Sequence, residues 1–195
     1  MGINNIFQDL RIKIVDPKKL SFVDKLLVWS RRNSLWLLVF GIKCCAIEDL
    51  MVPGASNYDF ERFGVLPRNS PRQCDLMIIT GPITHKMAQP LRTLYEQMAE
   101  PRYVIATGEC SICGGPWKGM YSVVDGADQI IPVDVYIPGC PPKPESLLEG
   151  IIKLEEKILK GEVRKKFLPP SGDSFSIHRA SQYLYVYSQA LRLHL

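Results

Sequence analysis

Long apolar runs are missing from this 195-residue chain. The longest apolar stretch, Leu35 to Ile42, contains Gly41 and is much shorter than the ~18–20 residues that a membrane-spanning helix needs. The first ten residues also lack the basic and apolar regions of a secretory signal. We therefore expect a protein of the cytosolic compartment that carries no transmembrane helix.

Internal repeats, low-complexity tracts and a nucleic-acid-binding module are absent as well. The formal net charge of +4 is too small to argue for a nucleic-acid partner. Hydrophobic residues make up 46% of the chain, and the 15 prolines and 14 glycines are spread through it and do not form a linker. This composition is typical of one globular α/β domain with a buried core.

Positive charge is concentrated at the start of the chain. Within residues 1–35, seven Lys and Arg stand against three Asp, and this difference (7 − 3 = 4) equals the net charge of the whole chain. Residues 20–32 show helical apolar spacing, so 1–32 is predicted to be a basic amphipathic segment that lies near anionic lipid or an acidic partner. A solvated helix face is the alternative. Residues 162–195 are predicted to be an extension that binds a partner chain.

Between these ends, residues 33–161 alternate apolar runs with helical patterns. The predicted strands are Leu35–Phe40, Asp75–Thr80, Tyr103–Thr107 and Ile130–Ile137, and the predicted helices cover about 45–50, 84–98 and 144–160. Such alternation with short turns favours right-handed βαβ units. The fold is predicted to be α/β, a small flavodoxin-like parallel sheet flanked by helices, with its functional crevice at the C-terminal ends of the strands.

The six cysteines point to that same crevice, since thiols in a reducing compartment favour metal ligation over disulfides. Cys44 and Cys45 follow the first predicted strand, Cys110 the third and Cys140 the fourth, so the four should meet at one edge of the sheet. Four thiolates are the ligand set of a [4Fe-4S] cluster. A zinc scaffold is less suited to adjacent cysteines, because zinc sites usually separate paired cysteines by two to four residues.

Other interpretations of the cysteines stay open at this point. The tandem pair could be two inert buried thiols, because cysteine often packs as a small hydrophobe. Cys74 precedes the second predicted strand, so it should pack at the opposite edge of the sheet. Cys113 forms a CxxC spacing with Cys110 and is ranked as a residue near the cluster, not a ligand.

Several segments together resemble one family. GIKCCAIE, SPRQCDLMIIT, YVIATGECSICGGPW and YIPGCPPKPE are similar to the cluster-carrying small subunit of respiratory complex I, the family of the NADH-quinone oxidoreductase B subunit, over about residues 22–160. The resemblance implies a [4Fe-4S] cluster held by Cys44, Cys45, Cys110 and Cys140. It also implies an oxidoreductase subunit without a complete active site, which passes electrons to quinone in an ion-translocating complex.

The partners implied by this resemblance are other subunits of the same complex. They are a hydrogenase-like large subunit at the quinone site, a ferredoxin-like iron–sulfur subunit and a membrane-arm subunit. The implied location is peripheral, on the cytoplasmic side of the cell membrane.

The chain also departs from the usual complex I pattern. Asp49 and Leu50 stand where the family commonly has two methionines, and residues 81–84 read GPIT in place of GTVT. These departures leave an alternative open: the small subunit of an energy-converting membrane-bound hydrogenase, an F420H2 dehydrogenase or a sulfur-reducing complex. Hydrogenase relatives usually space their first two cysteines as CxxC, so the tandem pair favours complex I or its F420H2- and sulfur-reducing relatives.

Two carboxylates lie close to the expected cluster ligands. Glu48 is three residues after Cys45, and Glu109 directly precedes Cys110. Because reduction makes a cluster more negative, a nearby carboxylate would bind a proton more readily, so both are candidate proton-coupled groups. The alternative is that each faces solvent or an arginine.

Overall fold

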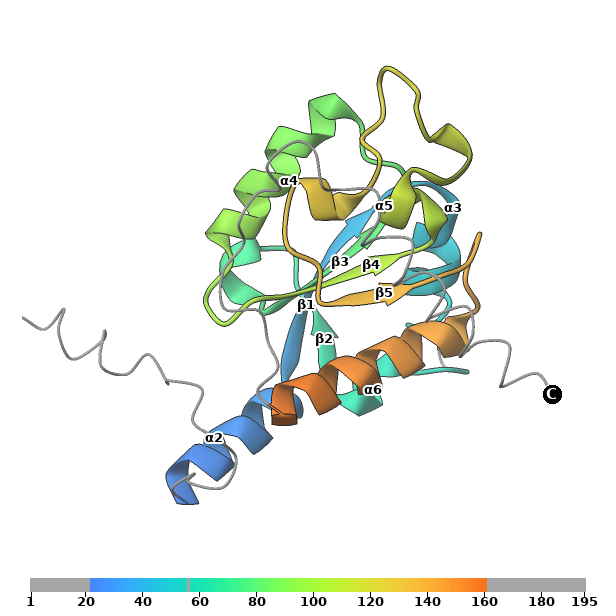
Figure 1. Ribbon diagram of the computed structural model, residues 1–195. Coiled ribbons are helices and arrows are strands. Elements are labelled where there is room, and N and C mark those ends of the chain that lie inside the picture. Colours follow the sequence, from blue (N-terminus) through green and yellow to red (C-terminus); the bar gives the residue numbers. More distant parts are fainter. Residues whose placement is uncertain (1–21, 56, 161–195) are drawn as a thin grey trace, which may run out of the picture.

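The computed structural model describes residues 22–55 and 57–160 (Figure 1). The expectations for residues 1–21 and for the extension 162–195 lie outside these described residues. The division of the chain at residues 32/33 and 161/162 stays a prediction.

Five parallel strands form one sheet in the order β2-β1-β3-β4-β5. Their bounds are β1 Leu35–Gly41, β2 Val65–Pro67, β3 Leu76–Thr80, β4 Tyr103–Thr107 and β5 Val135–Ile137. The all-parallel order 2-1-3-4-5 is the flavodoxin-like one, which reverses direction between β1 and β3. The predicted α/β class and flavodoxin-like sheet are therefore confirmed.

Helices fill the connections between the strands. The α-helices are α2 Phe22–Arg32, α3 Lys43–Ala46, α4 His85–Gln97, α5 Glu109–Cys113 and α6 Pro144–Lys160, and the π-helix η1 Ile47–Met51 continues α3. Short 3₁₀ turns lie at η2 Phe60–Phe63, η3 Pro71–Gln73, η4 Gly115–Trp117 and η5 Ala127–Gln129. The long predicted helices are confirmed within one or two residues at their ends.

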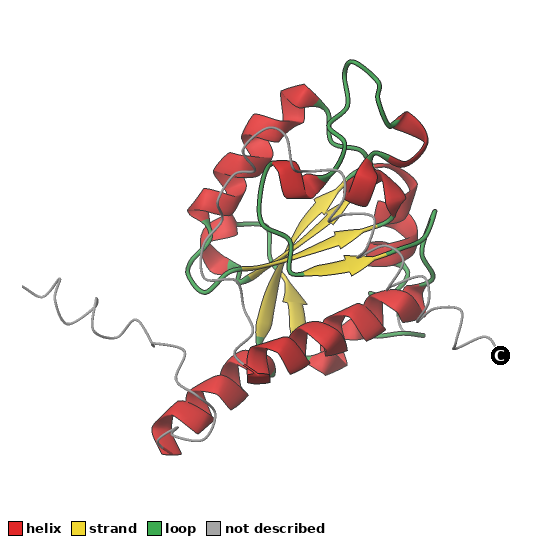
Figure 2. Cartoon of the chain, in the orientation of Figure 1, coloured by secondary structure: helices red, strands yellow, loops and turns green. Residues whose placement is uncertain are grey.

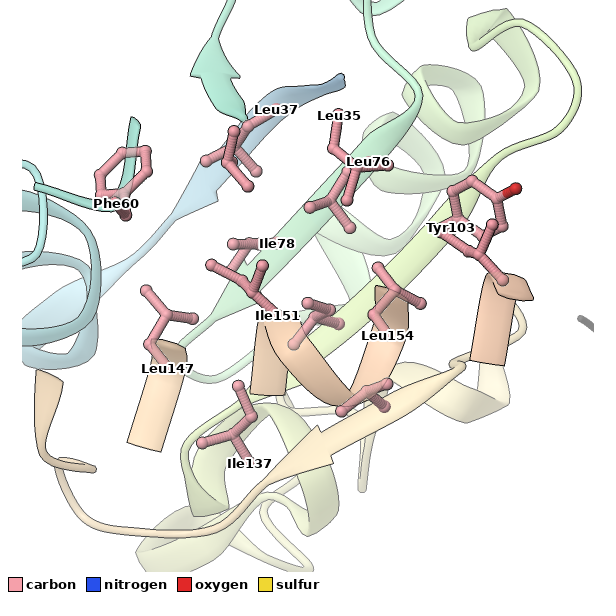
Figure 3. Close-up of a cluster of buried hydrophobic side chains, with 14 residues drawn as sticks. Leu35, Leu37, Phe60, Leu76, Ile78, Tyr103, Ile137, Leu147, Ile151 and Leu154 are labelled. Atoms are coloured by element: carbon pink, nitrogen blue, oxygen red, sulfur yellow. The ribbon is translucent and has the colours of Figure 1, made fainter. Parts of the chain in front are cut away.

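The sheet lies between α6 on one face and α4 on the other, which gives the domain two apolar cores (Figure 2). On the α6 face, alternate strand residues pack against the apolar stripe of the helix (Figure 3). This core includes Leu37, Leu76, Ile78 and Ile105 from the strands and Leu147, Ile151 and Leu154 from α6. The intervening strand residues face α4, with Leu91 fully buried among them. Burial on both faces explains why the strands read as continuous apolar runs.

Some details differ from the sequence-based expectation. β2 was not predicted, because only three of its residues pair with β1 and one of these is Pro67. β5 begins at Val135, five residues later than predicted, and α5 was not among the predicted helices. β1 is not buried on both faces throughout, since Val39 is 42% exposed where β2 has already ended.

Within the described residues, we find no helix that combines the length and the apolar character needed to cross a membrane.

Candidate metal centre

The loops that follow β1, β4 and β5 leave the same edge of the sheet. Figure 1 shows α3 and α5 side by side at the arrowheads of the strands, with α2 at the opposite end of the molecule. In sheets of this topology, ligands bind beyond the carboxyl ends of the strands, where the strand order reverses. Cys44, Cys45, Cys110 and Cys140 all come from these loops.

A sharp turn separates the tandem cysteines from β1. Lys43 has a left-handed backbone with φ of 59°, which is uncommon for a residue with a side chain. The preceding Ile42 N–H donates a hydrogen bond to Thr80 Oγ1 at 3.1 Å, which fixes the turn to the end of β3. As a result α3 begins at once, and its first turn leaves Cys44 exposed while Cys45 is buried at 2% exposure. The sharp turn therefore lies directly before the cysteine pair, and both cysteines belong to α3.

Cys45 lies directly against the loop that carries Cys110. A β-carbon built on Gly108 would be 2.6 Å from Cys45 Sγ, and Gly108 has φ of +83°, so both space and backbone require glycine there. Gly108 N–H donates to Ile137 O at 2.9 Å, and Glu109 N–H donates to Gly139 O at 3.0 Å. These bonds place the loop of Cys110 beside the loop of Cys140.

Cys110 occupies the first turn of α5 and is 8% exposed. Burial raises the pKa of its thiol, and the neighbouring Cys140 and Cys44 raise it further, while the Lys43 charge lowers it and Cys113 raises it slightly. The three thiols Cys44, Cys110 and Cys140 therefore share one electrostatic neighbourhood. A thiol held protonated in this way gives up its proton when a cationic metal group compensates the thiolate charge.

The four thiols are not gathered tightly enough for a single ion. In the described part of the chain, no three His, Cys, Asp or Glu side chains are arranged to hold one metal ion. A cube-shaped cluster offers several irons and spreads its thiolates further apart.

Three observations indicate that the same edge suits such a cluster. The donor set is all thiol, which is the usual ligand chemistry of iron–sulfur groups, and Gly108 leaves the backbone bare beside Cys45. Thr107 at the end of β4 adds a buried hydroxyl that has no hydrogen-bond partner in the described structure. A buried polar atom of this kind commonly marks a missing ligand or ion.

The remaining cysteines and carboxylates lie around this centre. Cys74 is fully buried before β3 and donates to Ser70 O at 3.1 Å, which confirms the prediction of a packing thiol at the opposite edge. Cys113 ends α5, and its thiol donates to Glu109 O at 3.4 Å. Glu48 is exposed on η1, and Glu109 is half-buried at the start of α5. Their coupling to protons stays a prediction.

Sequence reasoning missed one contact at this edge. Lys43 Nζ lies 4.0 Å from the centre of the Trp117 ring, in cation–π contact across the two cysteine loops. The signal was a basic residue immediately before the tandem cysteines, but its left-handed backbone could not be foreseen from composition.

Known proteins resemble this chain over most of the described domain. A family model described as NADH ubiquinone oxidoreductase, 20 Kd subunit, matches residues 43–154. The NADH-quinone oxidoreductase B subunit of Amoebophilus asiaticus is 60% identical over 137 residues, which cover 70% of this chain and 85% of that protein. Its counterpart from Chlorobium limicola is 59% identical over 137 residues, covering 70% and 72% respectively.

A solved structure is similar as well. A chain of the membrane-bound sulfane sulfur reductase, an archaeal respiratory membrane complex, matches with a TM-score of 0.66 and 45% sequence identity. The match covers 70% of this chain and 77% of that chain. The family match spans more than half of the sequence, including all four cysteines at the strand ends. The chain therefore belongs to the family of the 20 kDa subunit of NADH ubiquinone oxidoreductase.

Proposed function

We propose that this chain is an electron-transfer subunit of a membrane-associated, complex I-like oxidoreductase. In this proposal Cys44, Cys45, Cys110 and Cys140 hold a [4Fe-4S] cluster that is the last carrier before quinone. The observation that carries the proposal is the placement of four thiols from three loops at one edge of the sheet, two buried and two exposed.

The chain's own residues would hold the cluster and control its surroundings. Cys45 and Cys110 would ligate it from the buried side, and Cys44 and Cys140 from the side that faces out of the domain. When bound, the cluster supplies one-electron transfer between a reduced carrier and an oxidised acceptor. The protein excludes water on the inner side and supplies the charges that favour one oxidation state over the other.

The surface beside the tandem cysteines is suited to a partner subunit. Ile47 and Met51 on η1 are 62% and 75% exposed, and Val39 is exposed at the nearby end of β1. Apolar side chains grouped in this way commonly mark an interface. We assign this surface to the hydrogenase-like large subunit, with quinone bound at the shared boundary, and expect a ferredoxin-like iron–sulfur subunit as the electron donor.

The opposite end of the molecule would face the membrane arm. On α2, Phe22, Leu26 and Trp29 are exposed, and the helix ends with Arg31 and Arg32. An exposed apolar face with basic residues fits a membrane-arm subunit at an anionic surface. We therefore place the protein peripherally, on the cytoplasmic side of the membrane, in a complex that couples electron transfer to ion translocation.

A second candidate function has support of its own. The archaeal structure that is 45% identical is a sulfane sulfur reductase. Asp49, Leu50 and the GPIT segment at 81–84 depart from the usual complex I residues. In the sulfur-reducing form of this alternative, the acceptor is a sulfur–sulfur bond, which takes two electrons as it is cleaved. The related energy-converting hydrogenase and F420H2 dehydrogenase complexes stay within this alternative.

The ligand assignment is tested in the intact complex by electron paramagnetic resonance. Replacing Cys140 by Ser is expected to abolish the [4Fe-4S] signal or convert it to another cluster type. Cys74→Ser is the matched control, since that thiol is buried at the other edge and its loss should leave the signal unchanged. A normal reduced spectrum in Cys140→Ser would overturn the ligand set.

The same purified complex separates the two candidate functions. Reduction of a soluble quinone analogue, with no turnover of polysulfide, supports the first candidate. Turnover of polysulfide without quinone reduction supports the second.

A further inference from the structure

Lys43 adopts a left-handed backbone conformation. Its φ of 59° is a backbone conformation that costs free energy for a residue with a β-carbon. Such conformations persist only where the surroundings fix them. Here the fixed turn puts a cationic side chain directly before Cys44.

Trp117 holds the far end of the same side chain. The ring comes from η4, which immediately follows α5 and therefore belongs to the loop region of Cys110. Lys43 Nζ lies 4.0 Å from the ring centre, so the ammonium group is bridged between the loop of Cys44 and that of Cys110. A cation–π contact attracts the ammonium group to the ring face, so it favours one position of this long flexible side chain.

The charge of Lys43 also reaches the thiols. A β-carbon built on Gly115, the first residue of η4, would lie 3.2 Å from Cys110 Sγ, so the turn whose Trp117 contacts the Lys43 ammonium group packs against that thiol. A positive charge is thus placed at a centre whose ligands are all negative when ionised. The sequence patterns alone did not indicate a function for Lys43.

We propose that Lys43, positioned by Trp117, sets the reduction potential of the cluster bound at this edge. The inference rests on the proposed function, because it presumes that the four thiols hold a redox cluster. Reduction adds one electron, and therefore one negative charge, to the cluster. A nearby positive charge stabilises that reduced form, so it raises the midpoint potential. Lys43 is a positioning residue: it donates no electron and ligates no iron.

The test is a redox titration of the intact complex, followed by the cluster's paramagnetic signal. Lys43→Asn removes the charge with a residue that tolerates a left-handed backbone. It is expected to lower the midpoint potential. Lys43→Arg keeps the charge and stacks well on an aromatic ring, so it is expected to restore the potential to near the wild-type value. A purely structural role for Lys43 would not produce this split between Asn and Arg.

Two further variants complete the design. Trp117→Leu removes the ring that holds Lys43. It should lower the midpoint potential, but by less than Lys43→Asn does. Lys160→Gln is the control for net charge, because Lys160 ends α6, about 24 Å along that helix from Pro144, and its loss should leave the potential unchanged.

The outcomes distinguish this inference from the function on which it rests. An unchanged midpoint potential in Lys43→Asn, with a normal cluster spectrum, would overturn the role of Lys43 and leave the proposed function standing. Absence of any [4Fe-4S] signal in the wild-type complex would overturn the proposed function itself. If Lys43→Asn fails to assemble, Trp117→Leu decides, because a wild-type potential in that variant would also overturn the inference.

Discussion

The two edges of the sheet are built from different interactions. At the N-terminal ends of the strands, charged and polar side chains are paired with one another or with the backbone. At the C-terminal ends, four thiols, a bare glycine and a strained lysine lie together, and two of the thiols are exposed. The first edge stabilises the fold, and the second presents the chemistry of a ligand site.

The N-terminal edge shows how that stabilisation is distributed. Arg32 Nε lies 3.1 Å from Glu155 Oε2, which joins α2 to α6 across a nearly buried carboxylate. Asp134 Oδ2 accepts from Val104 N–H at 2.9 Å, and Lys157 Nζ donates to Asp134 O at 2.6 Å. Each of these bonds connects elements that are distant in sequence, so this edge fixes the helices on the sheet.

The C-terminal edge has the opposite character. Its loops are held by backbone hydrogen bonds, such as Glu109 N–H to Gly139 O, and they carry the thiols of the candidate site. Functional sites are commonly placed where local strain is supported by a rigid scaffold. Damage to this edge should therefore affect the cluster first, and damage to the other edge should affect stability first.

The largest effect is expected from Gly108→Ala. The new methyl group would lie 2.6 Å from Cys45 Sγ at a φ of +83°, so Cys45 must move. We expect loss of the cluster signal and a fall of about 1–3 kcal/mol in the free energy of unfolding. Chemical denaturation and paramagnetic resonance measure the two effects.

Gly119→Ala is the matched control for that substitution. Gly119 has a similar φ of +76°, but a β-carbon there meets no atom within 4 Å. Gly119→Ala should therefore lower the free energy of unfolding only through its strained backbone, and its cluster signal should be kept. Loss of the signal in both variants would show that backbone strain, and not contact with Cys45, is responsible.

An intermediate effect is expected at alkaline pH from Tyr103 at the N-terminal edge. Burial raises the pKa of Tyr103 from 10.0 to about 12. The folded state then keeps the phenol neutral, while the unfolded chain ionises from pH 10 upward. Stability is therefore unaffected below pH 10 and falls between pH 10 and pH 12, by about 2–3 kcal/mol at 1.36 kcal/mol per pKa unit.

Denaturation curves of wild type and Tyr103→Phe across that pH interval check this expectation. The Phe variant should lose less stability as the pH rises. Tyr121→Phe is the control, since Tyr121 is 94% exposed, and it should follow wild type. An equally steep alkaline loss in Tyr103→Phe would assign the effect to other groups.

The smallest effect is expected from Arg32→Ala. Removing the guanidinium leaves the buried Glu155 carboxylate without this ion pair, but Arg32 is itself 38% exposed, so solvent screens part of the interaction. We expect a loss of about 1–2 kcal/mol of unfolding free energy and an unchanged cluster spectrum.

The exposed pair of Arg92 and Glu96 offers the comparison for Arg32. Both side chains are more than half exposed, so Arg92→Ala should cost at most about 0.5 kcal/mol. A changed midpoint potential in Arg32→Ala would show that the two edges of the sheet are coupled and do not act separately.

Sequence alone predicted the features that depend on chain-wide patterns. Continuous apolar runs located β1, β3 and β4, because strands buried on both faces have little freedom in composition. The position of Cys44, Cys110 and Cys140 after separate strands predicted one shared edge, because parallel strands end on the same side. Cys74 was set apart by the same reasoning.

Features that depend on tertiary contacts were not predictable. β2 is too short to show a pattern, and it exists because its three residues pair with the edge of β1. The left-handed backbone of Lys43 is stabilised by the hydrogen bond from Ile42 to Thr80 and by the contact with Trp117. Thr80 is 38 residues further along the chain than Ile42, and Trp117 is more than 70 residues further than Lys43. No local propensity encodes such contacts.

The parallel topology has a consequence for how the site comes into being. Parallel strands cannot be joined by tight hairpins, and even the central pair joins Leu37 to Leu76 across a long intervening segment. Closing such loops slows folding. Because β5 is the last strand of the sheet and Cys140 follows it, the fourth thiol reaches its neighbours only when the sheet is complete. If the four thiols hold the proposed cluster, iron and sulfide supplied earlier would meet scattered thiols, and we expect cluster insertion to follow completion of the sheet.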